Sequence, residues 1–74
     1  MSPAEDVCAP LDGTVVLVTA GPGEVVRAGQ QLLVIESMKM ELAITAPTAG
    51  TVHDLHLRPG DRVTLRQPLV ALGA

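Results

Sequence analysis

The 74-residue sequence contains no phenylalanine, tyrosine or tryptophan, and only one cysteine and one lysine. Without aromatic side chains there is nothing to stack on a nucleic-acid base, and a net charge of −3 without a basic run offers no attraction to a phosphate backbone. These absences exclude a nucleic-acid-binding role. The single Cys8 excludes an internal disulfide and fits a reducing, cytoplasmic compartment.

Long hydrophobic runs are also absent. Every apolar stretch is of strand length and is broken by Glu, Gly or Pro, well short of the roughly 20 residues that a membrane helix needs. The opening MSPAEDV has no basic segment followed by an apolar one, so we expect neither a secretion signal nor a membrane partner. A chain of this length predicts one small domain, residues 1–74.

The sequence does contain an aliphatic core and a repeat. Ten valines, ten leucines and two isoleucines supply a close-packed aliphatic interior. Shifted by 37 residues, half its length, the sequence matches itself without a gap: APLDGTV at 9–15 falls on APTAGTV at 46–52, and Pro22-Gly23 falls on Pro59-Gly60. This match indicates an internal duplication into halves 1–37 and 38–74, related by a pseudo-twofold axis.

Each half reads as short strands separated by turns. Runs rich in Val, Leu and Ile predict strands over 6–9, 14–18, 31–36, 40–46, 51–57 and 68–72. Pro22-Gly23 suits a type II turn, because Pro fixes the first φ and Gly accepts the positive second one. Helix signals are poor, because apolar residues do not recur at helical spacing for long. The sequence therefore predicts an all-β protein, a small sandwich or flattened barrel of antiparallel strands.

The alternation of apolar residues slips within 51–57, which predicts a bulge near His53 and Asp54. His53 and His56 are three residues apart, so a regular strand would direct them to opposite faces, although a bulge could bring them together. No thiol or carboxylate pattern completes a ligand set. We expect solvated surface histidines rather than a metal site.

The single lysine lies between two predicted strands, in the stretch VIESMKMELAI at 34–44. LLVIES and MELAIT, joined at Met38-Lys39, predict a tight hairpin with Lys39 at its tip, although the Asn-Gly or Asp-Gly pair usual in type I′ turns is missing. The repeat maps this turn onto the chain termini. Lys39 and the termini are therefore expected at opposite ends of the domain, which suits a tethered module.

An isolated lysine in a β protein often only solubilises a turn, with neighbouring methionines filling the ends of the core. Three features favour a functional role here. Lys39 is unique, Met38 and Met40 bracket it, and it lies where one half of the duplication gives way to the other.

The residues ESMKME, Glu36 to Glu41, resemble the biotin attachment motif of biotin carboxyl carrier domains, whose usual form is Ala-Met-Lys-Met. APLDGTV before the motif, AGQQLLVIE leading into it and APTAGTV after it agree with the family pattern, so the resemblance covers about residues 7–72. It implies a flattened barrel of two four-stranded antiparallel sheets, a barrel-sandwich hybrid, that holds biotin covalently.

The resemblance implies a carrier rather than an enzyme, with no catalytic residue and no metal. Lys39 is expected to receive biotin from a biotin protein ligase. A biotin carboxylase then carboxylates the biotin, and a carboxyltransferase of an acyl-CoA or related carboxylase takes up the carboxyl group. The flanking residues that these partners are expected to read are Glu36, Ser37, Met38, Met40 and Glu41.

The sequence departs from the family pattern in three places. Ser37 replaces the commoner Ala, a small-for-small change. Arg66 stands where the first half has Gly29 and where many relatives also have Gly, which puts that turn in doubt. The short 20–24 loop lacks the inserted thumb of some bacterial acetyl-CoA carboxylase carriers, and this points to other acyl-CoA, pyruvate or urea carboxylases or to a free-standing attachment protein.

Three alternatives remain open at this point. A lipoyl domain of a 2-oxoacid dehydrogenase or of the glycine cleavage system shares the fold, but its hairpin more often reads Asp-Lys-Ala, so Met-Lys-Met favours biotin. A stand-alone enzyme is disfavoured, because no Ser/His/Asp or Cys/His set, phosphate-binding glycine loop or paired-carboxylate cleft is apparent. A structural module that binds through a strand edge is the third alternative.

Overall fold

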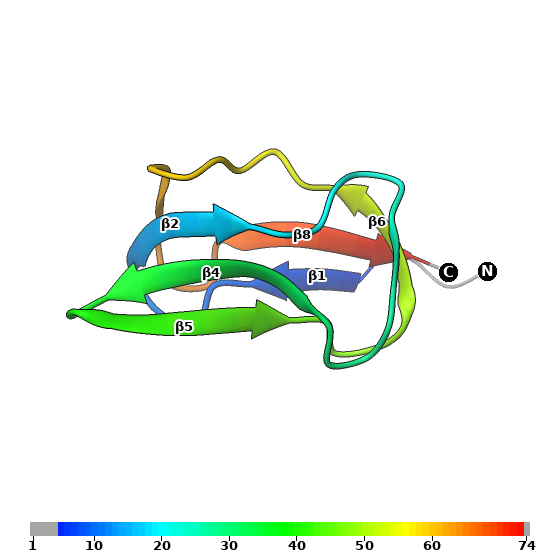
Figure 1. The fold of residues 1–74 in the computed structure, drawn as a ribbon, viewed down its shortest axis with the longest axis horizontal. Coiled ribbons are helices and arrows are strands. Elements are labelled where there is room, and N and C mark those ends of the chain that lie inside the picture. The colour runs from blue at the N-terminus through cyan, green and yellow to red at the C-terminus, as the bar shows by residue number, and fades with distance from the viewer. Residues whose placement is uncertain (1–4, 74) are drawn as a thin grey trace.

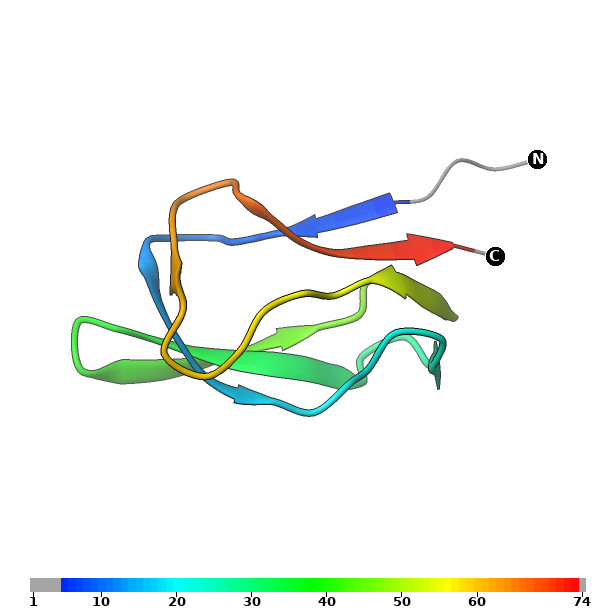
Figure 2. The same ribbon diagram turned by 90° about the horizontal axis from the view of Figure 1, so that it is seen from above.

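The computed structural model describes residues 5–73, which form two four-stranded antiparallel sheets (Figure 1). The strand orders are β1-β8-β6-β3 and β5-β4-β2-β7. The strands are β1 (Glu5–Cys8), β2 (Gly13–Val18), β3 (Val25–Val26), β4 (Gln31–Ser37), β5 (Met40–Thr45), β6 (Gly50–Asp54), β7 (Arg62–Val63) and β8 (Pro68–Gly73). Figure 2 shows the two layers, with β1 (blue) and β8 (red) above β4 and β5 (green). The predicted flattened barrel is confirmed.

The predicted strands all form, and two were missed. β3 and β7 have two residues each, too few to show an alternation in the sequence. The strand expected over 51–57 ends at Asp54 instead, since the chain leaves β8 there and continues toward the next turn. The predicted bulge is confirmed, because the register of β6 against β8 shifts between Val52 and Asp54. Between residues 5 and 73 we find no helix that could span a membrane.

Strand pairing repeats with the 37-residue offset. In the β2–β4 ladder Val15 pairs with Ile35, and in the β6–β8 ladder Val52 pairs with Leu72. In each ladder the residue directly after this pair is bulged, Val16 in β2 and His53 in β6. The remaining ladders correspond in the same way. The two sheets are thus equivalent in their backbone pairing, which supports the pseudo-twofold axis.

An aliphatic core fills the space between the sheets. Among the described residues no polar or charged side chain is buried, and Leu32, Leu33 and Ile35 of β4 have no exposed surface. The buried residues are Val7, Ala9, Val15, Ala20, Val26, Leu32, Leu33, Ile35, Ile44, Ala46, Val52, Leu55, Val63, Leu69, Val70 and Leu72. Because β4 lies over this core along most of its length, it is a rigid support for the hairpin at its end.

The Pro-Gly turns also repeat. The amide of Glu24 donates a hydrogen bond to the carbonyl of Gly21 (3.1 Å), and Gly23 has a φ of +85°, as a type II turn requires. The Glu24 carboxylate accepts a further hydrogen bond from the Gly21 amide (3.1 Å). The predicted turn is confirmed, and Asp61 closes the second Pro-Gly turn in the same manner on the amide of Arg58 (2.9 Å).

The turn at Arg66, which the sequence put in doubt, forms with strain. Arg66 has a φ of 68°, where its counterpart Gly29 has 85°. For an L-residue this left-handed conformation costs roughly 1–2 kcal/mol. The turn is held by Asp12, whose carboxylate accepts a hydrogen bond from the amide of Leu65 at 2.6 Å, and by the bond from the Arg66 amide to the Ala9 carbonyl at 2.7 Å.

The lysine hairpin and the described ends of the chain lie at opposite ends of the molecule. The extents are 39 × 20 × 19 Å, and the β4–β5 turn lies at one end of the long axis, whereas β1 begins and β8 ends near the other (Figure 1). The expectation for Met1 and Ala74 themselves lies outside the described residues.

Candidate functional site

The candidate site is the turn between β4 and β5. Ser37 pairs with Met40 across the two strands, leaving Met38 and Lys39 as the two residues of the turn. Their φ values are 53° and 64°, so both lie in the left-handed region that a type I′ turn requires. The hairpin predicted from the sequence is confirmed, although two L-residues occupy positions where Asn-Gly or Asp-Gly is usual.

The paired strands hold the turn in its strained backbone conformation. Two left-handed L-residues cost roughly 1–2 kcal/mol each, and six residue pairs between β4 and β5 hold the chain in this path. A Cβ added to Gly13 of β2 would lie 2.7 Å from the carbonyl oxygen of Glu36. Glycine therefore lets β2 approach the base of the hairpin, so that the turn projects from a three-stranded support.

Lys39 is exposed at the tip. Among residues 5–73, none of the side-chain hydrogen bonds or ion pairs involves its ammonium group. The flanking methionines do not fill the ends of the core: Met38 is 92% exposed and Met40 is 71% exposed. The turn thus presents one cation between two flexible apolar side chains, all accessible to a partner.

Glu36 and Glu41 pair directly across the strands, one position below the turn. They form the closer, non-hydrogen-bonded type of pair, with Cα atoms about 4.5 Å apart, and like charges in this position are destabilising. Both side chains are exposed. Two carboxylates therefore lie side by side at the base of the lysine turn.

A shallow groove of about 160 Å³ lies beside the turn. Its lining is mostly apolar and consists of Leu11, Ser37, Met38, Met40, Glu41 and Leu42. Ser37, Met38, Met40 and Glu41 were predicted site residues, and the groove brings these four together. Leu11 and Leu42 also line the groove and were not predicted. Leu11 comes from the β1–β2 connection, and nothing in its local sequence links it to the hairpin.

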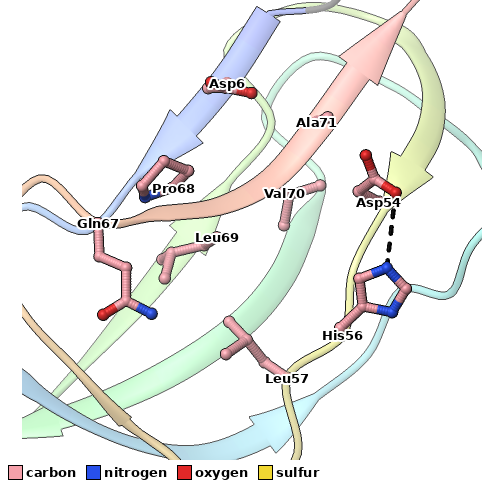
Figure 3. A pocket seen from close by; sticks show the side chains of 9 residues that line it. All are labelled: Asp6, Asp54, His56, Leu57, Gln67, Pro68, Leu69, Val70 and Ala71. Atoms are coloured by element: carbon pink, nitrogen blue, oxygen red, sulfur yellow. Dashed lines mark ion pairs between the residues drawn. The ribbon is translucent and has the colours of Figure 1, made fainter.

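A second hollow, of about 320 Å³, lies along β8 and the residues that follow β6, away from the lysine turn (Figure 3). Asp54 and His56 form an exposed ion pair there, with 3.5 Å between the Oδ1 and Nε2 atoms. His53, by contrast, lies against Gly73, since a Cβ on that glycine would meet its ring. No three His, Cys, Asp or Glu side chains between residues 5 and 73 are placed to share a metal ion.

The fold and the hairpin together define a small β domain that presents one lysine at the end of a strand pair. Residues 5–72 match the family model described as "Biotin-requiring enzyme". The chain belongs to this family, as the ESMKME motif indicated, and biotin is accordingly its cofactor.

Two curated relatives are similar over most of the chain. The mitochondrial propionyl-CoA carboxylase alpha chain of Mus musculus is 42% identical over 66 residues, which are 89% of this chain and 9% of that protein. The biotin carboxyl carrier protein of Streptococcus mutans is 37% identical over 71 residues, 96% of this chain and 55% of that protein. The chain therefore spans only a part of the proteins it resembles.

Solved structures agree with the fold. The urea carboxylase of Kluyveromyces lactis superposes with a TM-score of 0.89 at 26% identity, over 99% of this chain and 6% of that one. The lipoyl domain of the 2-oxoglutarate dehydrogenase complex of Azotobacter vinelandii gives a TM-score of 0.79 at 28% identity, over 93% and 95% of the two chains. The lipoyl domain shares the fold, but the relatives and the family description favour a biotin carboxyl carrier domain.

Proposed function

We propose that the chain is one biotinyl domain, residues 1–74 in two duplicated halves, which holds biotin on Lys39 and carries a carboxyl group between two enzymes. The observation that carries this proposal is the hairpin. The chain's single lysine stands exposed at its tip, bracketed by two exposed methionines, on strands anchored in the core.

The residues at the turn fit biotin. The amine projects into solvent from a fixed backbone, and the neighbouring groove offers an apolar surface to a hydrocarbon arm. Acylation removes one positive charge, so it changes the net charge of the chain from −3 to −4 and leaves a neutral arm. When bound, biotin supplies a carrier for one carboxyl group.

Each residue at the turn has a proposed part in loading. The Lys39 amine loses its proton and attacks the activated carboxyl carbon of biotinyl adenylate, so that an amide bond forms and AMP leaves. Met38 and Met40 offer adaptable contacts to successive partners, because their thioether side chains take up many conformations. Ser37, Glu36 and Glu41 complete the surface that partners read.

We infer that the domain catalyses no reaction of its own. Its partners are a biotin protein ligase, which loads it, a biotin carboxylase, which charges it, and a carboxyltransferase, which discharges it toward an acyl-CoA or related acceptor. Support comes from the relatives, whose printed names are those of carboxylases and of a carrier protein. The exposed Cys8 suits the reducing cytoplasm that the sequence predicts.

The cofactor is tested by offering the protein biotin with a biotin protein ligase and, in parallel, lipoate with a lipoate ligase. Intact mass should rise by one biotinyl group in the first reaction and stay unchanged in the second. The matched variant M38D/M40A, which gives the hairpin the Asp-Lys-Ala residues more usual in lipoyl domains, should take up biotin more slowly. Uptake of lipoate alone by the wild type would refute the proposal.

A further inference from the structure

The pseudo-twofold axis provides an internal comparison of the two outward sheet faces. The outward positions below the two carboxylates on β2, β4 and β5 have counterparts 37 residues away, at the same places in the other sheet's ladders. In one sheet the row next below the two carboxylates runs through Ala43, Val34 and Leu17. In the other sheet the equivalent row runs through Asp6, Ala71 and Asp54.

The side chains on these equivalent positions differ in kind. Leu17 is 47% exposed and the bulged Val16 is 37% exposed, where their counterparts are Asp54 and His53. Within the row, Ala43 at the sheet edge has Asp6 as its counterpart. The duplicated backbone accepts charged residues at these places. The apolar residues on the lysine-bearing side are therefore not a requirement of the fold.

The carboxylates of Glu36 and Glu41 lie between this apolar row and the lysine turn. No described side chain forms an ion pair or hydrogen bond with either of them. Arg62 lies in the same cross-strand row as the two carboxylates, on the far side of Thr14. It is two strand spacings, about 10 Å, from Glu36. A basic group placed between the two carboxylates would relieve their repulsion, so this end of the face is complementary to a cation.

Of the three proposed partners, the ligase is the one that reacts at the lysine itself. The Nζ atom is separated from the turn backbone only by one side chain, so an active site that encloses it must contact the hairpin and the row of residues below. The carboxylase and the carboxyltransferase act at the far end of the arm and need not approach so closely.

We propose that the outward face formed by Val16, Leu17, Val34 and Ala43, together with Glu36 and Glu41, is the docking surface for the ligase that loads Lys39. The ligase contributes an apolar contact to Leu17 and a basic side chain between the two carboxylates. This inference rests on the proposed function, since it requires that Lys39 be biotinylated.

The test replaces residues of this face with the residues found at the equivalent positions of the other sheet. L17D and A43D each introduce the residue that the protein itself has at the equivalent position, Asp54 or Asp6, so the strand geometry tolerates them. V25D is the matched control: Val25 is 75% exposed, belongs to the other sheet, and gains the same charge. Circular dichroism melting curves establish that each variant is folded.

Initial rates of biotin incorporation are measured by intact mass over a range of protein concentrations. L17D and A43D should each raise KM about tenfold with little change in kcat, because a charge is placed in an apolar contact. V25D should stay within about twofold of the wild type. The double variant E36Q/E41Q should reduce kcat/KM and weaken its dependence on salt concentration.

The outcomes are separable. If L17D and A43D both match V25D, the docking surface is wrong while the carrier function stands. If L17D changes kcat alone, the face does not contribute to docking, and the inference also fails. If the wild type itself takes up no biotin, the proposed function fails.

Discussion

Substituting Met38 with glycine should stabilise the protein. Met38 has a φ of 53°, and its side chain is 92% exposed, so the substitution relieves backbone strain and removes almost no core packing. The strain relieved is roughly 1–2 kcal/mol, and the added freedom of glycine in the unfolded chain takes back roughly 0.4–1 kcal/mol. The net gain of about 0.5–1 kcal/mol corresponds to a Tm about 2–8 °C higher in a domain of this size.

The matched control is Met40→Gly. Met40 is also well exposed, at 71%, but it lies in β5 and is not among the residues with positive φ. Glycine there should destabilise the strand by roughly 0.5–1 kcal/mol. Because the chain has no aromatic fluorophore, unfolding is followed by far-ultraviolet circular dichroism in urea and on heating. If M38G is destabilised as much as M40G, the account of a strained turn is wrong.

Two further substitutions test the supports of the fold. R66G should gain about 0.5–1 kcal/mol in unfolding free energy, since it relieves a φ of 68°; an unchanged urea midpoint would contradict the strain at that turn. G13A should lose about 1–3 kcal/mol, because its Cβ would lie 2.7 Å from a β4 carbonyl oxygen, whereas G21A, whose Cβ meets nothing within 4 Å, should stay within about 0.5 kcal/mol. Equal urea midpoints for these two alanine variants would show that β2 does not press on the hairpin.

Much of the fold could be predicted because the duplication repeats its signals. The strands around Val15 and Val52 and the turn at Pro22-Gly23 follow from local patterns that occur twice, and the bulge at His53 follows from the slipped alternation within 51–57. The two-residue strands β3 and β7 could not be predicted, since their pairing depends on neighbours distant in sequence. The same holds for Asp12, which bonds an amide 53 residues away.

The candidate site, too, could be predicted from the sequence only in part. Lys39 and its flanking residues are contiguous in the sequence, so the motif and the repeat boundary were enough to locate them. The outward face was not predictable, because the run Val15 to Val18 is apolar throughout. Only the bulge at Val16 shows that Leu17 faces solvent rather than the core. The groove needed the fold as well, since it depends on Leu11 lying beside the hairpin.

The central claim is that Lys39 is the single attachment point for biotin. It is tested most directly by intact mass spectrometry of the wild type and of K39R after incubation with a biotin protein ligase, ATP and biotin, with peptide mapping to locate the modified residue. The wild type should gain the mass of one biotinyl group, located on Lys39, and K39R should gain none. An unmodified wild type, or an equal gain on K39R, would contradict the account.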